Sequence, residues 1–307
     1  MATPTAPLGG GPTVASLLAA ASAQVDAIDA QALLLTALGR AAHDRAWLFA
    51  HGEDPLTPEA VAHYRSLVER RCHGEPLAYI LGEREFFGLR LQVDARVLDP
   101  RADTETLVDW ALECLATGAE SSPRVLDLGT GSGAIALAIA HTAPSTSVTA
   151  VDASREALAL AQANALRLGL TLRFAHGSWF DPVAGDQFDL VVSNPPYIAE
   201  DDPHLAALRH EPRVALVSGA DGLDDLRRII AAAPAHLAPG GWLLLEHGWN
   251  QAEAVRALLT QAGFESVQSR HDLAGIARCS GGRWRTSSAK LRQFGFSLPP
   301  QEAKDHE

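Results

Sequence analysis

The fold of this chain is decided by the nine residues VLDLGTGSG at positions 125–133. A short apolar run there leads into alternating glycines, a pattern that predicts a buried strand, a tight turn and a helix beginning near Ala134. Glycine has no Cβ, so Gly129, Gly131 and Gly133 let the backbone turn sharply and approach a bound molecule closely. We therefore expect a ligand site directly after this strand.

Outward from this stretch, the chain from about residue 100 alternates apolar strands with helical segments, such as those predicted at 155–168 and 251–262. This alternation predicts a mostly parallel sheet with helices on both faces. The last two strands follow each other without a helix, which predicts an antiparallel edge. The seven predicted strands span residues 124–128, 147–151, 172–175, 188–193, 242–247, 266–270 and 276–280.

The first eighty or so residues have a different, helical pattern. Thr57 suits a helix N-cap, Pro58 the first helical position and Gly74 a helix end. Between residues 83 and 99, short apolar runs with a bend at Gly88 predict a β-hairpin. The predicted segments are a disordered leader at 1–12, a helical domain at 13–82, a β-hairpin linker at 83–99, an α/β domain at 100–285 and a flexible tail at 286–307.

Composition narrows the possible functions. The 307 residues carry a formal net charge of −12, which argues against a general nucleic-acid binder with a basic stripe. Cys72, Cys114 and Cys279 lack paired spacing, so we expect a reduced cytoplasmic compartment and no metal. The apolar runs are too short to cross a bilayer, and the first dozen residues do not resemble a signal peptide. We therefore expect no membrane association and no direct nucleic-acid binding.

Two acidic residues flank the predicted ligand site. Asp152 ends the second strand, where a carboxylate can accept hydrogen bonds from both hydroxyls of a ribose. A glycine loop alone would also suit a dinucleotide, or a purely structural turn. Asp127, however, would repel a pyrophosphate and attract the ammonium of an amino-acid tail. Its position favours the sulfonium cofactor S-adenosylmethionine.

The tetrapeptide NPPY at residues 194–197 directly follows the strand predicted at 188–193. Ligands bind at the carboxyl ends of strands in such sheets, so this loop should face the cofactor. Two prolines stiffen the loop and leave its carbonyl groups without neighbouring amide donors. The side-chain oxygen of Asn194 and the carbonyl of Pro195 can then accept both protons of one planar NH₂ group, while Tyr197 offers a ring face. The alternative is a structural turn before the next helix.

This arrangement suits methyl transfer to an amide-like nitrogen. Such a nitrogen delocalises its lone pair and is a poor nucleophile. Two fixed acceptors orient the NH₂ group and favour the positive charge that develops as the methyl group arrives. Alignment of the nitrogen with the methyl group contributes the rest of the rate enhancement. No general base is needed before transfer, because the product nitrogen then loses its proton easily.

The glycine loop resembles the first motif of Rossmann-like S-adenosylmethionine methyltransferases. Loops of the NPPY type also occur in enzymes that methylate adenine N6 or guanine N2. Over about residues 75–284, however, the chain resembles the protein-(glutamine-N5) methyltransferase family of peptide chain release factors, the HemK or PrmC proteins. The motifs that carry this resemblance are GEREF at 82–86, PRADTE at 100–105, VLDLGTGSG at 125–133, NPPYI at 194–198, EPRVAL at 211–216, DGL at 221–223, GWLLLEHG at 241–248 and DLAG at 272–275.

The resemblance implies a class I, Rossmann-like methyltransferase domain with a seven-stranded, mostly parallel sheet, and a small N-terminal helical domain joined by a β-hairpin. It implies methyl transfer from S-adenosylmethionine, leaving S-adenosylhomocysteine, to N5 of the glutamine in the Gly-Gly-Gln motif of peptide chain release factors. Release factors are then the expected partners. Because a free glutamine would need no second domain, the architecture itself leads us to expect that the helical domain recognises the protein substrate. We also expect a cytoplasmic monomer. Implied cofactor contacts are Asp127, Gly129, Thr130, Gly131, Ser132, Gly133, Asp152, Trp179 and Asn194, and implied catalytic and substrate-binding residues are Asn194, Pro195, Pro196 and Tyr197.

Several roles stay open. Trp179 is either a flat partner for adenine or a packing residue. Ala102 stands where the family often has proline, next to a polar cluster of Asp103, Thr104 and Glu105. These residues either form a capping box, with Thr104 or Asp103 as the cap, or lie beside the cofactor. The segment 211–213 is either a wall of the substrate pocket or a structural turn.

Three rival functions also stay open. The first is a ribosomal-RNA or DNA amino-group methyltransferase, against which the acidic charge counts. A ribosomal-protein glutamine methyltransferase is a nearer alternative. The third is a non-catalytic subunit that binds the cofactor only, although the complete NPPY loop favours activity.

Overall fold

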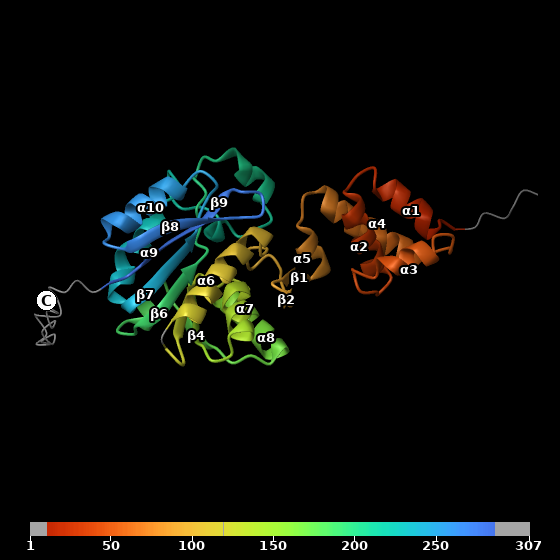
Figure 1. Ribbon diagram of the computed structural model, residues 1–307. Coiled ribbons are helices and arrows are strands. Elements are labelled where there is room, and N and C mark those ends of the chain that lie inside the picture. The colour runs from red at the N-terminus through yellow and green to blue at the C-terminus, as the bar shows by residue number, and fades with distance from the viewer. Residues whose placement is uncertain (1–10, 119, 286–307) are drawn as a thin grey trace, which may run out of the picture. The chain divides into compact units, whose positions relative to one another are not determined.

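A computed structural model describes residues 11–118 and 120–285 of the chain (Figure 1). The predicted leader, apart from its last two residues, and the predicted tail at 286–307 lie outside these residues. The chain divides into two compact units. Among the described residues, the first unit comprises 11–100 together with Asp201–Leu216, and the second comprises 101–118, 120–200 and 217–285.

The first unit begins with a helical bundle. Side-chain oxygens of Thr13, Asp26 and Thr57 accept hydrogen bonds at the starts of three helices, as N-caps do. Tyr64 lies in the core of the bundle and donates to the carbonyl of Ala30 at 3.2 Å. The helices are α1 Val14–Ala21, α2 Ala27–Ala37, α3 Arg45–Ala50, α4 Pro58–Cys72 and α5 Leu77–Leu81.

The predicted hairpin is present in the first unit. Its strands β1, Glu83–Phe86, and β2, Leu89–Gln92, pair antiparallel. Phe87 and Gly88 connect them with φ angles of 50° and 75°. Two positive φ angles in a two-residue loop are typical of the tight turns that match the twist of a hairpin.

The segment Asp201–Leu216 belongs to the first unit, although it lies within the residues predicted for the α/β domain. It contains the short helices η3, Pro203–Leu208, and η4, Arg213–Ala215. The buried Glu211 accepts a hydrogen bond from the backbone N–H of Asp99 at 3.2 Å. His210 approaches the carbonyl of His73 at 3.0 Å. These contacts between distant parts of the chain explain why the segment joins this unit.

The second unit is built on a seven-stranded sheet with the order β5-β4-β3-β6-β7-β9-β8. The pairs among β5, β4, β3, β6 and β7 are parallel, and β9 pairs antiparallel with both β7 and β8. The strands are β3 Arg124–Leu128, β4 Ser147–Asp152, β5 Arg173–His176, β6 Phe188–Ser193, β7 Leu237–Glu246, β8 Glu265–His271 and β9 Ala277–Arg283. The predicted Rossmann-like class with its antiparallel edge is confirmed.

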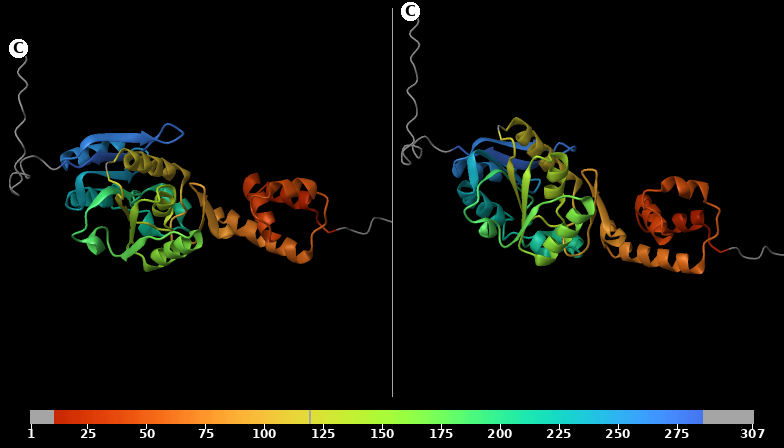
Figure 2. Two further views of the ribbon diagram at one scale, coloured as in Figure 1. Left: turned by 60° about the horizontal axis from the view of Figure 1, so that its bottom comes forward. Right: turned by 90° about the horizontal axis from the view of Figure 1, so that it is seen from below.

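Helices cover both faces of this sheet (Figures 1 and 2). Helix α6 packs against α7, and α9 packs against α10. The helices are α6 Glu105–Thr117, α7 Ala134–Thr142, α8 Arg155–Leu168, α9 Asp224–Ala232 and α10 Ala252–Gln261, with the short helices η1 Ala102–Thr104, η2 Asp181–Val183 and η5 Ala233–Ala235. Across residues 11–118 and 120–285, no helix is both long and apolar enough to span a membrane.

The central strands form the core of the second unit. Val125 and Leu126 of β3, Val191 of β6 and Leu244 of β7 have no solvent exposure. A strand buried on both faces has little freedom to move, so the residues directly after β3, β6 and β7 have a rigid base. Because these strands are parallel neighbours, their carboxyl ends meet at one edge of the sheet.

Candidate active site

The glycine loop after β3 is tied to β4 by backbone hydrogen bonds. The N–H groups of Gly129 and Thr130 both donate to the carbonyl of Val151 at 2.9 Å. Gly129 has φ 72°, and a Cβ placed on it would lie 3.5 Å from the ring of Trp179. The loop therefore passes directly beside the Trp179 ring, which is itself half-buried.

Asp152, the last residue of β4, faces the same loop. One carboxylate oxygen accepts from the N–H of Gly131 at 2.8 Å, and the other accepts from the N–H of Ser154 at 2.8 Å. Burial raises the pKa of this carboxyl, while those backbone donors lower it. Each carboxylate oxygen has more than one acceptor position, so Asp152 keeps capacity for hydroxyl donors.

Asp127 lies beneath the loop and is fully buried. Its Oδ2 accepts a hydrogen bond from the Thr130 hydroxyl at 2.6 Å. Burial raises the pKa of Asp127 to about 7. Within the described part of the chain its Oδ1 has no hydrogen-bond partner. A buried acceptor of this kind fits a donor group such as an ammonium.

The remaining loop residues are placed by their neighbours. Thr130 and Ser132 are buried, and the Ser132 carbonyl accepts from the side chain of Asn164 at 2.9 Å. Gly133, with φ 86°, is the N-cap of α7. The structure thus brings together the loop residues, Asp152 and Trp179 that the sequence predicted.

The NPPY loop leaves β6 at the same edge. Ser193, directly before it, donates from its hydroxyl to the carbonyl of Leu128 in β3 at 2.7 Å. The next residue, Asn194, donates from Nδ2 to Oγ1 of Thr104 at 3.2 Å. Its Oδ1 is buried and has no hydrogen-bond partner among the residues that the structure describes. Pro195 is buried, and Pro196 is half-buried.

Tyr197 is held at both ends. Its hydroxyl donates to Oε1 of Glu246 at 3.3 Å, and its carbonyl accepts from Nε2 of Gln251 at 3.0 Å. Burial is the main cause that raises the pKa of Tyr197, and the charge of Glu246 adds to it. Gly222 lies against the same carbonyl, because a Cβ on it would come within 2.2 Å of the Tyr197 oxygen. Tyr197 is therefore a neutral donor in a fixed position.

Glu246, the last residue of β7, lies beside Tyr197 at the same edge of the sheet, and the sequence did not single it out. It is 1% exposed, and burial raises its pKa to about 7. The Thr104 and Tyr197 hydroxyls and the charge of Arg278 act in the opposite direction. Arg278 itself pairs with Asp272 at 3.0 Å and with Asp103 at 3.1 Å. The available signal was a carboxyl residue at the end of a wholly apolar strand.

Comparison with known proteins agrees with this geometry. Residues 104–211 match the family model for the methyltransferase small domain, and residues 13–82 match that for the PrmC N-terminal domain. A release factor glutamine methyltransferase of Xylella fastidiosa is 52% identical over 275 residues, covering 89% of this chain and 98% of the relative. The chain belongs to the release factor glutamine methyltransferases.

Further relatives support this membership. The release factor glutamine methyltransferase of Bordetella pertussis is 53% identical over 258 residues, covering 83% of this chain and 94% of the relative. Among solved structures, the hMettl16 catalytic domain superimposes with a TM-score of 0.53 at 17% identity, covering 76% of this chain and 84% of that one. At that identity the likeness concerns the fold alone. The predicted family and enzyme class are confirmed for this release factor glutamine methyltransferase.

The structure bears on two of the open roles. Thr104 precedes α6 with helical φ and ψ of −66° and −20°, and no side-chain capping bond is seen there among the described residues. Asp103 pairs with Arg278 instead, so the capping-box interpretation is wrong. Glu211 bonds to the backbone of Asp99 within the first unit, as a structural turn would, and Arg213 is exposed.

Potential metal ligands do not gather into a site within the described residues. No group of three or more His, Cys, Asp or Glu side chains that could hold a metal occurs within residues 11–118 and 120–285.

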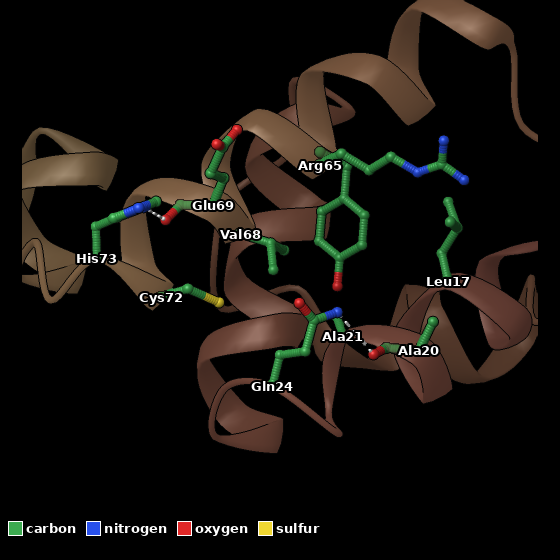
Figure 3. Close-up of a pocket in the computed structure, with 10 residues that line it drawn as sticks. Leu17, Ala20, Ala21, Gln24, Arg65, Val68, Glu69, Cys72 and His73 are labelled. Atoms are coloured by element: carbon green, nitrogen blue, oxygen red, sulfur yellow. Dashed lines mark hydrogen bonds between the residues drawn. The ribbon is translucent and has the colours of Figure 1, made fainter.

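A groove in the first unit does not involve the predicted site residues. It has a volume of about 510 Å³ and lies between α1 and α4 (Figure 3). Leu17 and Tyr64 line it together with Arg65 and Glu69, and none of the predicted site residues does.

Proposed function

We propose that this release factor glutamine methyltransferase transfers a methyl group from S-adenosylmethionine to the side-chain N5 of the glutamine in the Gly-Gly-Gln motif of peptide chain release factors. Asn194 carries the proposal, because within the described residues its buried Oδ1 has no partner and can accept from an NH₂ group. The Pro195 carbonyl follows in a stiff loop. Family membership supports glutamine as the source of this NH₂ group.

The cofactor site fits S-adenosylmethionine. Asp127 has a buried carboxylate oxygen available for the ammonium of its amino-acid tail, and Asp152 has acceptor capacity for the ribose hydroxyls. Trp179 presents a half-buried ring beside Gly129, which suits the flat adenine. When bound, the cofactor supplies an electrophilic methyl group on a sulfonium. We propose these three side chains as its principal contacts.

The chain's own part in the reaction is positioning and charge stabilisation. Asn194 Oδ1 and the Pro195 carbonyl hold the two amide protons in the amide plane, so the nitrogen lone pair lies perpendicular to both hydrogen bonds. Positive charge that develops on nitrogen is stabilised by these two acceptors, which need no reorganisation because the loop is already rigid. Tyr197 packs its ring against the amide plane. After transfer the cationic, N-methylated nitrogen is strongly acidic and releases one proton to water, so no buried base is required.

We also propose that the helical domain at 13–82 recognises the release factor. A free glutamine would need no second domain, and this stretch matches the PrmC N-terminal domain over the same residues. A protein that modifies a translation factor works where translation takes place, so we propose a cytoplasmic location. We also propose that the protein acts as a monomer.

The substrate class is tested by competition. Purified enzyme would be incubated with methyl-labelled S-adenosylmethionine and equal amounts of release factor, ribosomal protein and ribosomal RNA. We expect the label on the release factor, and no transfer by Asn194→Ala. Label on RNA or on ribosomal protein would instead favour one of the rival substrates.

A further inference from the structure

We propose that Thr104 and Glu246 are positioning residues that fix the direction of the Asn194 side-chain amide, with its nitrogen toward Thr104 and its oxygen toward the substrate. This inference rests on the proposed function for the identity of the substrate. The hydrogen bonds that carry it belong to the protein alone, and they can be measured without any substrate.

The direction of this amide matters because its two ends have opposite chemistry. The oxygen and nitrogen of an asparagine side chain have nearly the same size, so shape alone does not choose between the two orientations. With the oxygen toward the substrate, Asn194 accepts a proton of the glutamine NH₂ group. With the nitrogen there, two donors would face each other and the acceptor pair would be lost.

The hydrogen bonds behind Asn194 choose one orientation. Thr104 has a single hydroxyl proton, and its hydroxyl lowers the pKa of the Glu246 carboxyl, which is the direction in which a hydrogen-bond donor to that carboxyl acts. Its oxygen is therefore left as an acceptor, and it receives Nδ2 of Asn194 at 3.2 Å. A flipped Asn194 would bring a second acceptor to an oxygen whose proton is already committed. The chain of donors thus runs from Asn194 through Thr104 to Glu246.

Glu246 ends this chain as an acceptor. Tyr197 donates to its Oε1 at 3.3 Å, so two hydroxyls converge on one carboxyl. Among the described residues Oε2 has no partner, which leaves room for the proton of the neutral acid. Either protonation state therefore keeps Oε1 as an acceptor. The charged groups around it, Arg278 and Asp103, lie on other elements of the same unit.

The position of Thr104 agrees with this role. The residue is 3% exposed and lies at the start of α6, where a threonine commonly caps the helix. Within the described chain its side chain makes no capping bond. Its hydroxyl is used instead between Asn194 and Glu246, residues 90 positions and 142 positions away in sequence.

The first test compares Thr104→Val with Thr104→Ser. Valine keeps the shape but removes the hydroxyl, so Asn194 loses its directing partner. We expect kcat to fall roughly ten- to hundredfold while the affinity for S-adenosylmethionine stays unchanged. Serine restores the hydroxyl and should restore most of kcat. Equal kcat for the valine variant and the wild type would overturn the proposal.

A second variant covers the case in which Thr104→Val fails to fold. Glu246→Gln is nearly isosteric but can present an NH₂ group to Thr104. The Thr104 proton would then turn toward Asn194 and draw its oxygen inward, so kcat should fall as well. A Glu246→Gln variant with wild-type kcat would contradict the proposed direction of the chain.

A spectroscopic measurement separates this inference from the proposed function. In protein labelled with ¹⁵N-asparagine, the Asn194 NH₂ signals are assigned by their loss in Asn194→Asp. We expect a nuclear Overhauser contact between these protons and the Thr104 methyl group, weakened in Glu246→Gln. Its absence in the wild type would overturn the inference, whatever the substrate. Absence of release-factor methylation with this contact present would overturn only the proposed function.

Discussion

Replacement of Gly222 by alanine should displace the NPPY loop directly. The added Cβ would lie 2.2 Å from the Tyr197 carbonyl oxygen and 2.8 Å from Nε2 of Gln251. Ordinary contacts are about 3.5 Å or more, so the Tyr197 carbonyl must move by about 1 Å. A misplacement of about 1 Å at reacting groups can cost about a hundredfold in rate, or about 2.7 kcal/mol of transition-state stabilisation. We expect kcat/KM to fall by that factor.

The matched control is Gly169→Ala. Gly169 has φ 68°, close to the 75° of Gly222, but the described structure has nothing within 4 Å of its added Cβ. Both variants carry the left-handed strain of about 1–2 kcal/mol. Only Gly222→Ala adds overpacking, of about 1–3 kcal/mol. Urea unfolding should show this difference, and methylation of release factor should stay normal in the control. Normal kcat/KM in Gly222→Ala would refute the proposed tight fit around Tyr197.

Three further predictions follow from the site and the domains. Asp152→Ala should weaken S-adenosylmethionine binding roughly ten- to hundredfold by calorimetry, because charged hydrogen bonds contribute about 1.5–3 kcal/mol. Asp152→Asn should lose less of this affinity. Equal S-adenosylmethionine affinities of Asp152→Ala and the wild type would contradict the ribose assignment. Asp127 has a pKa of about 7 in the folded protein, above its value in the unfolded chain. The unfolded chain therefore releases the Asp127 proton first as pH rises, and the contribution of Asp127 to folding stability declines between about pH 4 and 7, by at most about 1.4 kcal/mol per pH unit. The stability of Asp127→Asn relative to the wild type should therefore be greater at pH 8 than at pH 5, and a pH-independent difference would contradict this. Deletion of residues 1–80 should raise the KM for release factor at least about tenfold while sparing cofactor affinity, whereas unchanged activity on whole release factor would argue against recognition by the helical domain.

Local patterns predicted the parts of the fold that local sequence determines. The glycines of residues 129–133 and the apolar runs of β3 and β6 specify their own backbone, so both strands have the predicted bounds. Strand β7 begins at Leu237, earlier than predicted, because Gly240 and Gly241 in its first half have the composition of a loop. Its pairing with β6 shifts register in this half.

The remaining features depend on contacts between distant residues. Thr104 has a sequence context that fits a capping box, and only the approach of Asn194 shows that its hydroxyl is used elsewhere. Glu246 lies in an apolar strand, and its proposed role depends on Tyr197 and Thr104. The placement of Asp201–Leu216 in the first unit likewise depends on contacts with residues more than a hundred positions earlier, such as the bond from Asp99 to Glu211. No single-sequence pattern encodes such pairings.

The central claim is that Asn194 presents the glutamine of a Gly-Gly-Gln motif to a methyl donor, and mass spectrometry of the reacted release factor tests it most directly. Release factor would be incubated with S-adenosylmethionine and either the wild type or Asn194→Ala, digested, and fragmented to locate the added methyl group. We predict one methyl group on the side-chain nitrogen of that glutamine with the wild type and none with Asn194→Ala. A methyl group on another residue, or equal methylation by both proteins, would contradict the account.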